Sequence, residues 1–259
     1  VVPTEMIMKM TMVGGMYAPT NEITIMAMGM FMSKDMDLNT YQPMMNRNQL
    51  GTFSTSSSDM SDISLGVLIK LQESESSRWH GEVTLQKSVG SNDVKGEVLT
   101  PMNMNSSMIL PYGMQPSDRG TKLVVGVTNV TKLSERWIWG SQLRRKSTLS
   151  NESWAFGDHT DLNTWIQYEL NHAVALSSRL QIIHQDKISG NNPMIMAPVQ
   201  TANTENYGGK EAYLGLGANF LMHLLPGEVD RFGLEVLLPL AQVSEFDRRS
   251  RIAFRRNEL

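Results

Sequence analysis

The stretch MTMVGGMYAPTNEITIMAMGMFM, Met10 to Met32, decides how this chain folds. Methionine recurs at almost every second position on both sides of the segment Ala-Pro-Thr-Asn at residues 18–21. Because successive side chains of a strand point to opposite faces, a two-residue period predicts a β-strand. Proline and asparagine in the interruption favour a turn. The stretch therefore predicts two neighbouring strands joined by a short connection.

The same two-residue alternation recurs along the whole chain, and the 3.6-residue period of a helix is almost absent. Several segments have one apolar face, as in Ile63, Leu65 and Val67, which alternate with Ser64 and Gly66. Ten strands are expected at residues 5–17, 22–35, 62–72, 78–88, 121–130, 136–146, 160–170, 173–187, 210–223 and 231–242. The fold class is therefore all-β.

The connections between these segments alternate in length. Short turns are expected at 18–21, 73–77, 131–135, 171–172 and 224–230, and long polar loops at 36–61, 89–120, 147–159 and 188–209. Soluble β-sandwiches use Greek-key connections instead. Barrels of the bacterial outer membrane have short turns at one end and long loops at the other. The pattern favours an up-and-down antiparallel transmembrane β-barrel over a soluble sandwich or barrel.

The order of turns also predicts the strand number. The first connection is short, so the first strand runs toward the short turns and one further strand is expected upstream of Val1. Residues 243–259 are the expected last strand. The chain is thus expected to be a single domain over residues 1–259, with 10–11 strands of a 12-stranded barrel.

Composition excludes several classes of function. The net charge is −3 and no long Lys/Arg run is present, which argues against nucleic acid as a partner. Cysteine is absent, which excludes disulfides, thiolate metal sites and thiol catalysis. No apolar run has the length of a transmembrane helix. No zinc-ligand spacing, phosphate-binding glycine loop or nucleophile elbow occurs, so neither a cofactor nor an enzymatic activity is expected.

The first methionine row consists of Met6, Met8, Met10 and Met12, whereas Lys9 and Thr11 lie on the other face of the same strand. Lysine against lipid costs about 2–4 kcal/mol near the bilayer midplane and about 0–1 kcal/mol near an interface. The methionines are therefore predicted to face the hydrocarbon, and Lys9 and Thr11 the lumen.

The second row consists of Met26, Met28, Met30 and Met32. A three-residue turn would place Met12 opposite Met28 and join both rows into one outward patch, whereas a two-residue turn would place the rows on opposite faces. Thioethers select Cu(I), so these four residues are also candidate copper ligands. The alternative is a flexible apolar filler on a lipid-facing wall.

Three further lumen-facing residues are predicted from the strand at 160–170: Asn163, Gln167 and Glu169, which alternate with Leu162 and Ile166. Aromatic residues near strand ends are candidates for the girdles at the membrane interfaces. They are Tyr17, Trp79, Trp137, Trp139, Trp154, Phe156, Trp165, Tyr168 and Tyr213.

The long loops hold more Pro, Met and Tyr than a connection requires. At least one of them is expected to fold into the lumen and narrow it, and the segment 102–115 is the candidate. A second feature, Asp158 beside His159 at the end of another long loop, suggests a hydrolase site at the barrel rim. Loss of activity on Asp158→Ala or His159→Ala would identify such a site.

Several segments resemble Gram-negative outer-membrane transporter proteins of the phenol-degradation meta-pathway (MetA-pathway) family of β-barrels. They are residues 2–41, Leu110-Pro-Tyr-Gly-Met-Gln115, Met196-Ala-Pro-Val-Gln-Thr-Ala202 and Asn206-Tyr-Gly-Gly209. The resemblance implies a channel for small, often hydrophobic solutes and a methionine-rich segment upstream of this chain. It implies no catalytic residues.

Together these patterns predict a bacterial outer-membrane protein that passes small solutes passively. Its expected partners are the lipid bilayer, the barrel-assembly machinery and an unidentified small solute. A methionine-based copper-binding or copper-tolerance protein and a rim-site hydrolase are the two alternatives.

Overall fold

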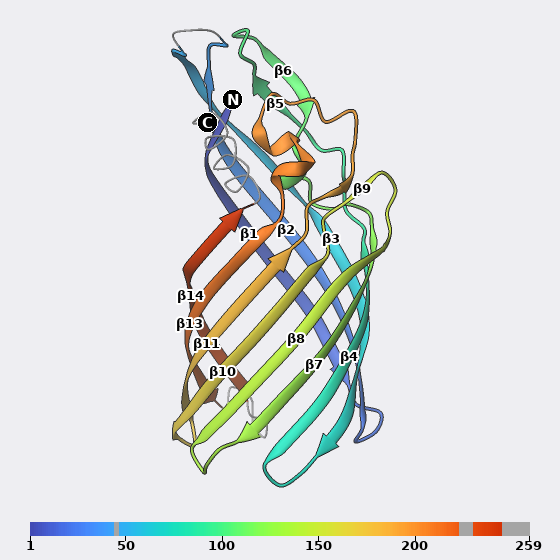
Figure 1. Ribbon diagram of the computed structural model, residues 1–259, viewed down its shortest axis with the longest axis vertical. Coiled ribbons are helices and arrows are strands. Elements are labelled where there is room, and N and C mark those ends of the chain that lie inside the picture. The colour runs from blue at the N-terminus through green and yellow to red at the C-terminus, as the bar shows by residue number, and fades with distance from the viewer. Residues whose placement is uncertain (44–46, 223–229, 245–259) are drawn as a thin grey trace, which may run out of the picture.

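The computed structural model describes residues 1–43, 47–222 and 230–244. Ten long antiparallel strands form one curled sheet (Figure 1). Their order in the sheet is β1 (Val2–Tyr17), β2 (Ile23–Tyr41), β3 (Gln49–Glu73), β4 (Ser77–Ser88), β7 (Thr121–Lys132), β8 (Trp137–Ser150), β10 (His159–Asn171), β11 (Val174–Gln185), β13 (Gly209–Met222) and β14 (Asp230–Ser244).

The all-β up-and-down prediction is confirmed, because each long strand pairs with its neighbours in the chain and no Greek-key crossing occurs among the described residues. The loops contain the short strands β5 (Lys95–Leu99), β6 (Asn105–Ile109), β9 (Trp154–Ala155) and β12 (Ser189–Gly190). They also contain the 3₁₀ turns η1 (Tyr112–Met114), η2 (Gln200–Ala202) and η3 (Thr204–Asn206). No helix in the described part is long and apolar enough to cross a membrane.

The sheet has two edge strands, because no ladder joins β1 to β14 within the described residues. Residues 243 and 244 of the expected last strand belong to β14. The remainder, 245–259, lies outside the described residues.

The convex face of the sheet carries a belt of aliphatic side chains that are exposed to the surroundings of the protein. Many of these residues pair with an aliphatic partner on the next strand, as in Leu65 with Leu85 and Val83 with Val125. The belt includes Ile25, Ile63, Leu65, Val83, Leu85, Val125, Leu143, Leu162, Ile166, Leu176, Leu180, Leu216, Leu234 and Val236. An apolar surface of this extent on an isolated chain indicates a partner that is itself apolar.

The aromatic residues predicted to form girdles lie in three different parts of the structure. Trp79, Trp137 and Trp139 lie on the convex face near the short turns, where Trp137 packs on Tyr168 at 4.7 Å between ring centroids. Trp154 and Phe156 are packed against each other among the loops instead. Trp165 lies on the concave face, with its ring over Gly140. The girdle prediction therefore fits the first group and is wrong for Trp154, Phe156 and Trp165.

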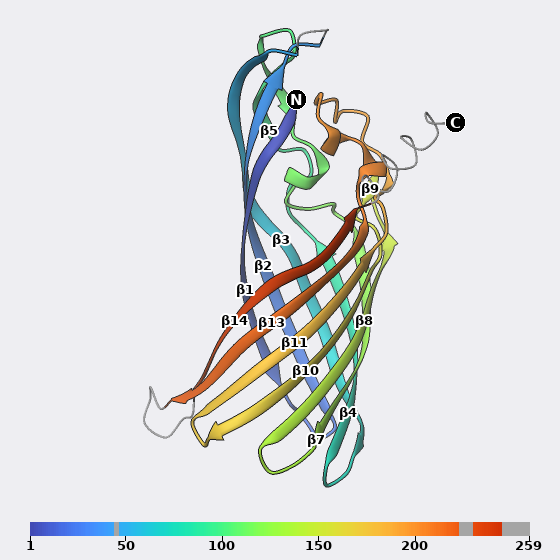
Figure 2. The ribbon, with the colours of Figure 1, turned by 60° about the vertical axis from the view of Figure 1, so that its left-hand side comes forward.

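The predicted long loop at 36–61 is mostly strand, because β2 extends to Tyr41 and β3 begins at Gln49. Polar residues such as Ser54, Ser56 and Ser58 hid the alternation in the sequence. Their neighbours Thr55 and Ser57 are buried on the concave face, as are Met36 and Leu38. This extended hairpin forms a wall that rises past the other strands (Figure 2).

Candidate channel interior and loop cap

The concave face is lined by polar side chains that bond to one another from strand to strand. Arg144 on β8 donates to Glu82 on β4 at 2.8 Å, and Gln142 donates to Thr128 on β7 at 2.9 Å. Farther along the sheet, Asp161 accepts hydrogen bonds from Asn163 and from Gln181. Alternation produces this lining, since the same strands place aliphatic residues on the convex face.

A cavity of about 480 Å³ lies against this polar wall. Asn163 and Gln167, two predicted lumen-facing residues, line it together with Trp165 and the Arg179–Glu235 ion pair. Glu169, the third, shares their face by alternation and pairs with Ala175. The side-chain atoms Arg144 Nε, Asn163 Oδ1 and Arg179 Nε are buried without a hydrogen-bond partner in the described part of the chain.

A second cavity, of about 310 Å³, has a mixed lining. One wall consists of methionines on β1 and β2, among them Met16, Met26, Met28 and Met30. The opposite wall includes the Glu82–Arg144 ion pair. This part of the interior offers both apolar contact and hydrogen bonds.

The register of β1 on β2 places the first methionine row on the concave face, the reverse of the predicted orientation. Met12 lies opposite Met30, and residues opposite each other in an antiparallel pair share a face. Lys9 and Thr11 lie opposite Ser33 and Phe31, and therefore on the convex face. Met26, Met28, Met30 and Met32 also lie on the concave side. The outward assignment is wrong for both rows. They adjoin as one patch, as expected, but Met12 lies opposite Met30 rather than opposite Met28, so the register that a three-residue turn would give is wrong by two residues.

The height of Lys9 in the sheet explains the reversal. Its partner Ser33 pairs in turn with Ser58, so this row of the convex face is polar. The apolar belt begins nearer the short turns, at the level of Ile63 and Leu65. Lysine at the margin of a belt costs little, so the penalty that favoured an inward Lys9 does not apply.

Three long connections meet over the same end of the sheet and form what we term the loop cap, residues 89–120, 151–158 and 186–208 (Figure 1). Most of the largest fully buried side chains of the described residues lie in this cap, among them Trp154, Tyr112 and Leu110. One cluster joins Met36 and Leu38 of β2 to Val98, Leu110 and Met114. A second cluster consists of Tyr112, Trp154, Ile188 and Ile195. The cap is therefore a packed body that is attached to the β2–β3 wall.

Lys34 anchors the segment 110–120 to β2. Its ammonium donates to the carbonyl oxygens of Gly113 at 2.8 Å and Gln115 at 2.7 Å. Ser57 on β3 donates to the carbonyl oxygen of Met114. The expected inward-folding loop thus exists, and its residues 110–120 contact the concave face.

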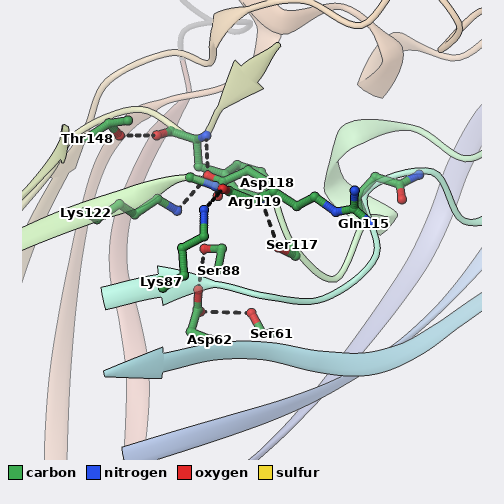
Figure 3. A network of polar contacts seen from close by, with 12 residues as sticks. Ser61, Asp62, Lys87, Ser88, Gln115, Ser117, Asp118, Arg119, Lys122 and Thr148 are labelled. Atoms are coloured by element: carbon green, nitrogen blue, oxygen red, sulfur yellow. Dashed lines mark hydrogen bonds and ion pairs between the residues drawn. The ribbon is translucent and has the colours of Figure 1, made fainter. Parts of the chain in front are cut away.

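Asp118 is the centre of a second anchor (Figure 3). Its carboxylate lies 2.6 Å from Lys122 Nζ on β7 and accepts backbone hydrogen bonds from Gly120 and Phe156. Burial acts to raise the pKa of Asp118, but the Lys122 ammonium and these hydrogen bonds outweigh it, and the pKa lies below its usual value. Asp118 is ionised at neutral pH and joins two loops of the cap to the sheet.

Tyr207 joins the remaining loop to the same segment. Its hydroxyl accepts a hydrogen bond from the Gly113 amide at 2.7 Å and donates to the Thr201 carbonyl oxygen at 2.7 Å. Burial raises the pKa of Tyr207, so it stays a neutral donor. The sequence segments 110–115 and 196–209, which carried the family resemblance, therefore meet in space.

The candidate hydrolase pair does not assemble as a catalytic group. The Asp158 carboxylate accepts from Arg145 at 3.0 Å and from the Thr148 amide at 2.9 Å, which fixes the start of β10. No contact between Asp158 and His159 side chains occurs among the interactions of the described residues. Asp158 therefore has a structural role at this rim.

No family model and no curated protein matches this sequence. Among solved structures, the chain is similar to an outer membrane channel from Pseudomonas putida F1, with 12% identity and a TM-score of 0.57. That match covers 92% of this chain and 77% of the channel. A FadL homologue of Pseudomonas aeruginosa matches at 8% identity and a TM-score of 0.45, over 89% of this chain and 59% of that one. The similarity to the first of these structures shows that the fold, a curled sheet of antiparallel strands, is that of the outer-membrane β-barrels.

Proposed function

We propose that this chain is a channel of the bacterial outer membrane that lets small solutes diffuse through its interior. The opposite chemistry of the two faces of one sheet carries the proposal: an exposed aliphatic belt outside and a hydrogen-bonded polar wall inside. In outer-membrane barrels the apolar face contacts lipid and the polar face lines the lumen. The similarity of fold to an outer membrane channel supports it.

Under this proposal the loop cap controls entry, because it lies at one end of the sheet and is anchored to the concave face by Lys34 and Asp118. The cavity beneath has both methionine and polar walls. We infer that it admits small solutes with an apolar part, in keeping with the small, often hydrophobic solutes that the family resemblance implies. The partners of the channel are then the bilayer and the machinery that inserts barrels into it.

Solute flux into liposomes tests the proposal. The purified chain, folded into phospholipid vesicles, is expected to make them permeable to small solutes that the bilayer alone excludes, such as small neutral sugars. Vesicles without protein are the baseline. The insertion of the protein into the vesicles is verified first. If the flux of every solute then stays at the level of the protein-free vesicles, the channel proposal is refuted.

Lys34→Met is expected to increase that flux, because it removes two charge-assisted hydrogen bonds, each contributing about 1.5–3 kcal/mol, that hold the segment 110–120. Lys9→Met is the matched control, since it removes the same charge from the convex face of the neighbouring strand. Equal flux through both variants and the unaltered chain would show that the Lys34 anchor does not limit entry.

A further inference from the structure

Methionines face one another across β1 and β2 in four pairs, which we term the methionine ladder. The pairs are Met6–Met36, Met10–Met32, Met12–Met30 and Met16–Met26. All lie on the concave face, because Met30 and Met26 line the interior cavity there. Directly opposite positions place Cβ atoms about 4.5–5.5 Å apart.

The two central pairs, Met10–Met32 and Met12–Met30, follow each other along the strands without an interruption. Same-face neighbours within a strand are about 7 Å apart. Each side chain has three rotatable bonds and a polarizable sulfur, so the four thioethers can converge on one point above the sheet. Met10 and Met12 are 56% and 59% exposed, which leaves them accessible from the interior.

A role as apolar filler does not account for this placement. The convex belt, which has only to be apolar, is built from leucine, isoleucine and valine. Methionine gathers instead on the concave face of two adjacent strands, opposite a polar wall. The property that distinguishes methionine from those residues is its sulfur.

We propose that Met10, Met12, Met30 and Met32 form a binding site for a soft monovalent cation, Cu(I). Thioethers favour Cu(I) over harder ions. Asp62 lies opposite Met30 on β3 and lines the same cavity. Its carboxylate accepts hydrogen bonds from Ser61 and Ser88 and adds negative charge to this part of the interior. Within the described residues, no group of three or more His, Asp or Glu side chains offers a competing site for a harder metal.

Silver(I) is a redox-inert probe of this site. We expect the folded chain in detergent to bind Ag(I) in a calorimetric titration, and the variant with Met10, Met12, Met30 and Met32 all replaced by leucine to lose that binding. Leucine keeps the apolar surface and removes only the sulfur. The matched control replaces Met102, Met104, Met194 and Met196, four exposed loop methionines, and should bind as the unaltered chain does. The proposal would be overturned if the unaltered chain did not bind Ag(I). It would also be overturned if the loop-methionine control lost Ag(I) binding while the variant at Met10, Met12, Met30 and Met32 kept it.

A footprint on the unaltered chain tests the site without a variant. Ag(I) should protect the four methionines of the proposed site, but not Met102 and Met196, from oxidation by dilute peroxide, as read by mass spectrometry of peptides. Equal protection of ladder and loop methionines would exclude a specific site. Solute flux is measured in parallel, because the channel and the metal site rest on separate observations and either can fail while the other stands.

Discussion

At the scale of single residues, the cap depends on charged groups buried at its contacts with the sheet. Lys34 is 3% exposed and Asp118 is 1% exposed, values that are rare for charged side chains unless they are paired. Both have their partners: carbonyl oxygens for Lys34, and Lys122 with two amides for Asp118. Removing the Asp118 carboxylate leaves the Lys122 ammonium buried and uncompensated, at a cost of about 3–5 kcal/mol.

Asp118 should make the cap sensitive to acid. Its pKa in the folded chain lies below the unfolded value of about 3.9, so its stabilisation is fully present above pH 4 or so and is lost as the pH falls through the folded pKa. Flux through the channel in planar bilayers should therefore rise as the pH is lowered below about 4.

The Asp118→Asn variant should show high flux already at neutral pH. Because it lacks the titrating carboxylate, its flux should not rise further when the pH is lowered. The same titration on Glu152→Gln, whose exposed carboxylate lies 3.8 Å from Arg119 near the same loops, should resemble the unaltered chain. Identical profiles for all three proteins would contradict a role for Asp118 in holding the cap.

At the scale of elements, strand register decides which chemistry each face of the sheet presents. β1 alternates Met, Ile, Lys and Thr, and either face would be acceptable by composition. The pairing of Met12 with Met30 and of Val13 with Gly29 fixes the methionines inside and Val13 outside. A shift of the register by one residue would exchange the two faces.

Cysteine labelling tests this orientation cleanly, because the chain has no cysteine of its own. In lipid vesicles, a charged maleimide should react with Met12→Cys through the wet interior and be excluded from Val13→Cys by lipid. Both variants should react equally after unfolding in urea. Faster labelling of Val13→Cys in vesicles would reverse the assignment of faces.

At the scale of the whole molecule, the exposed belt is explained only by its surroundings. Leu65 is 62% exposed and lies in the middle of the aliphatic run of β3. In a water-soluble protein, substitution of so exposed a side chain would change stability by less than about 0.5 kcal/mol.

In a bilayer, Leu65→Arg should destabilise the chain by about 2–4 kcal/mol, since the arginine would enter hydrocarbon near the midplane. Reversible urea unfolding from phospholipid vesicles measures this difference. Ser64→Arg, one position along and facing the interior, is the control and should cost much less. Equal and small effects of the two substitutions would indicate that the belt does not contact lipid.

The sequence by itself determined the existence of the ten long strands, their up-and-down order and the polar face that carries Asn163 and Gln167, because alternation is a local property of the chain. It also indicated that the segment 102–115 folds inward. It did not determine the extension of β2 and β3 through residues 36–61, where polar residues conceal the alternation. The faces of β1 and β2 and the residues of the cap anchors were decided by tertiary structure. Lys34 and Asp118 are 84 positions apart, and their partners lie on other strands and loops. The register of neighbouring strands determines which side of a strand faces the interior. That register depends on the connecting turn and on the depth of each row of residues in the membrane.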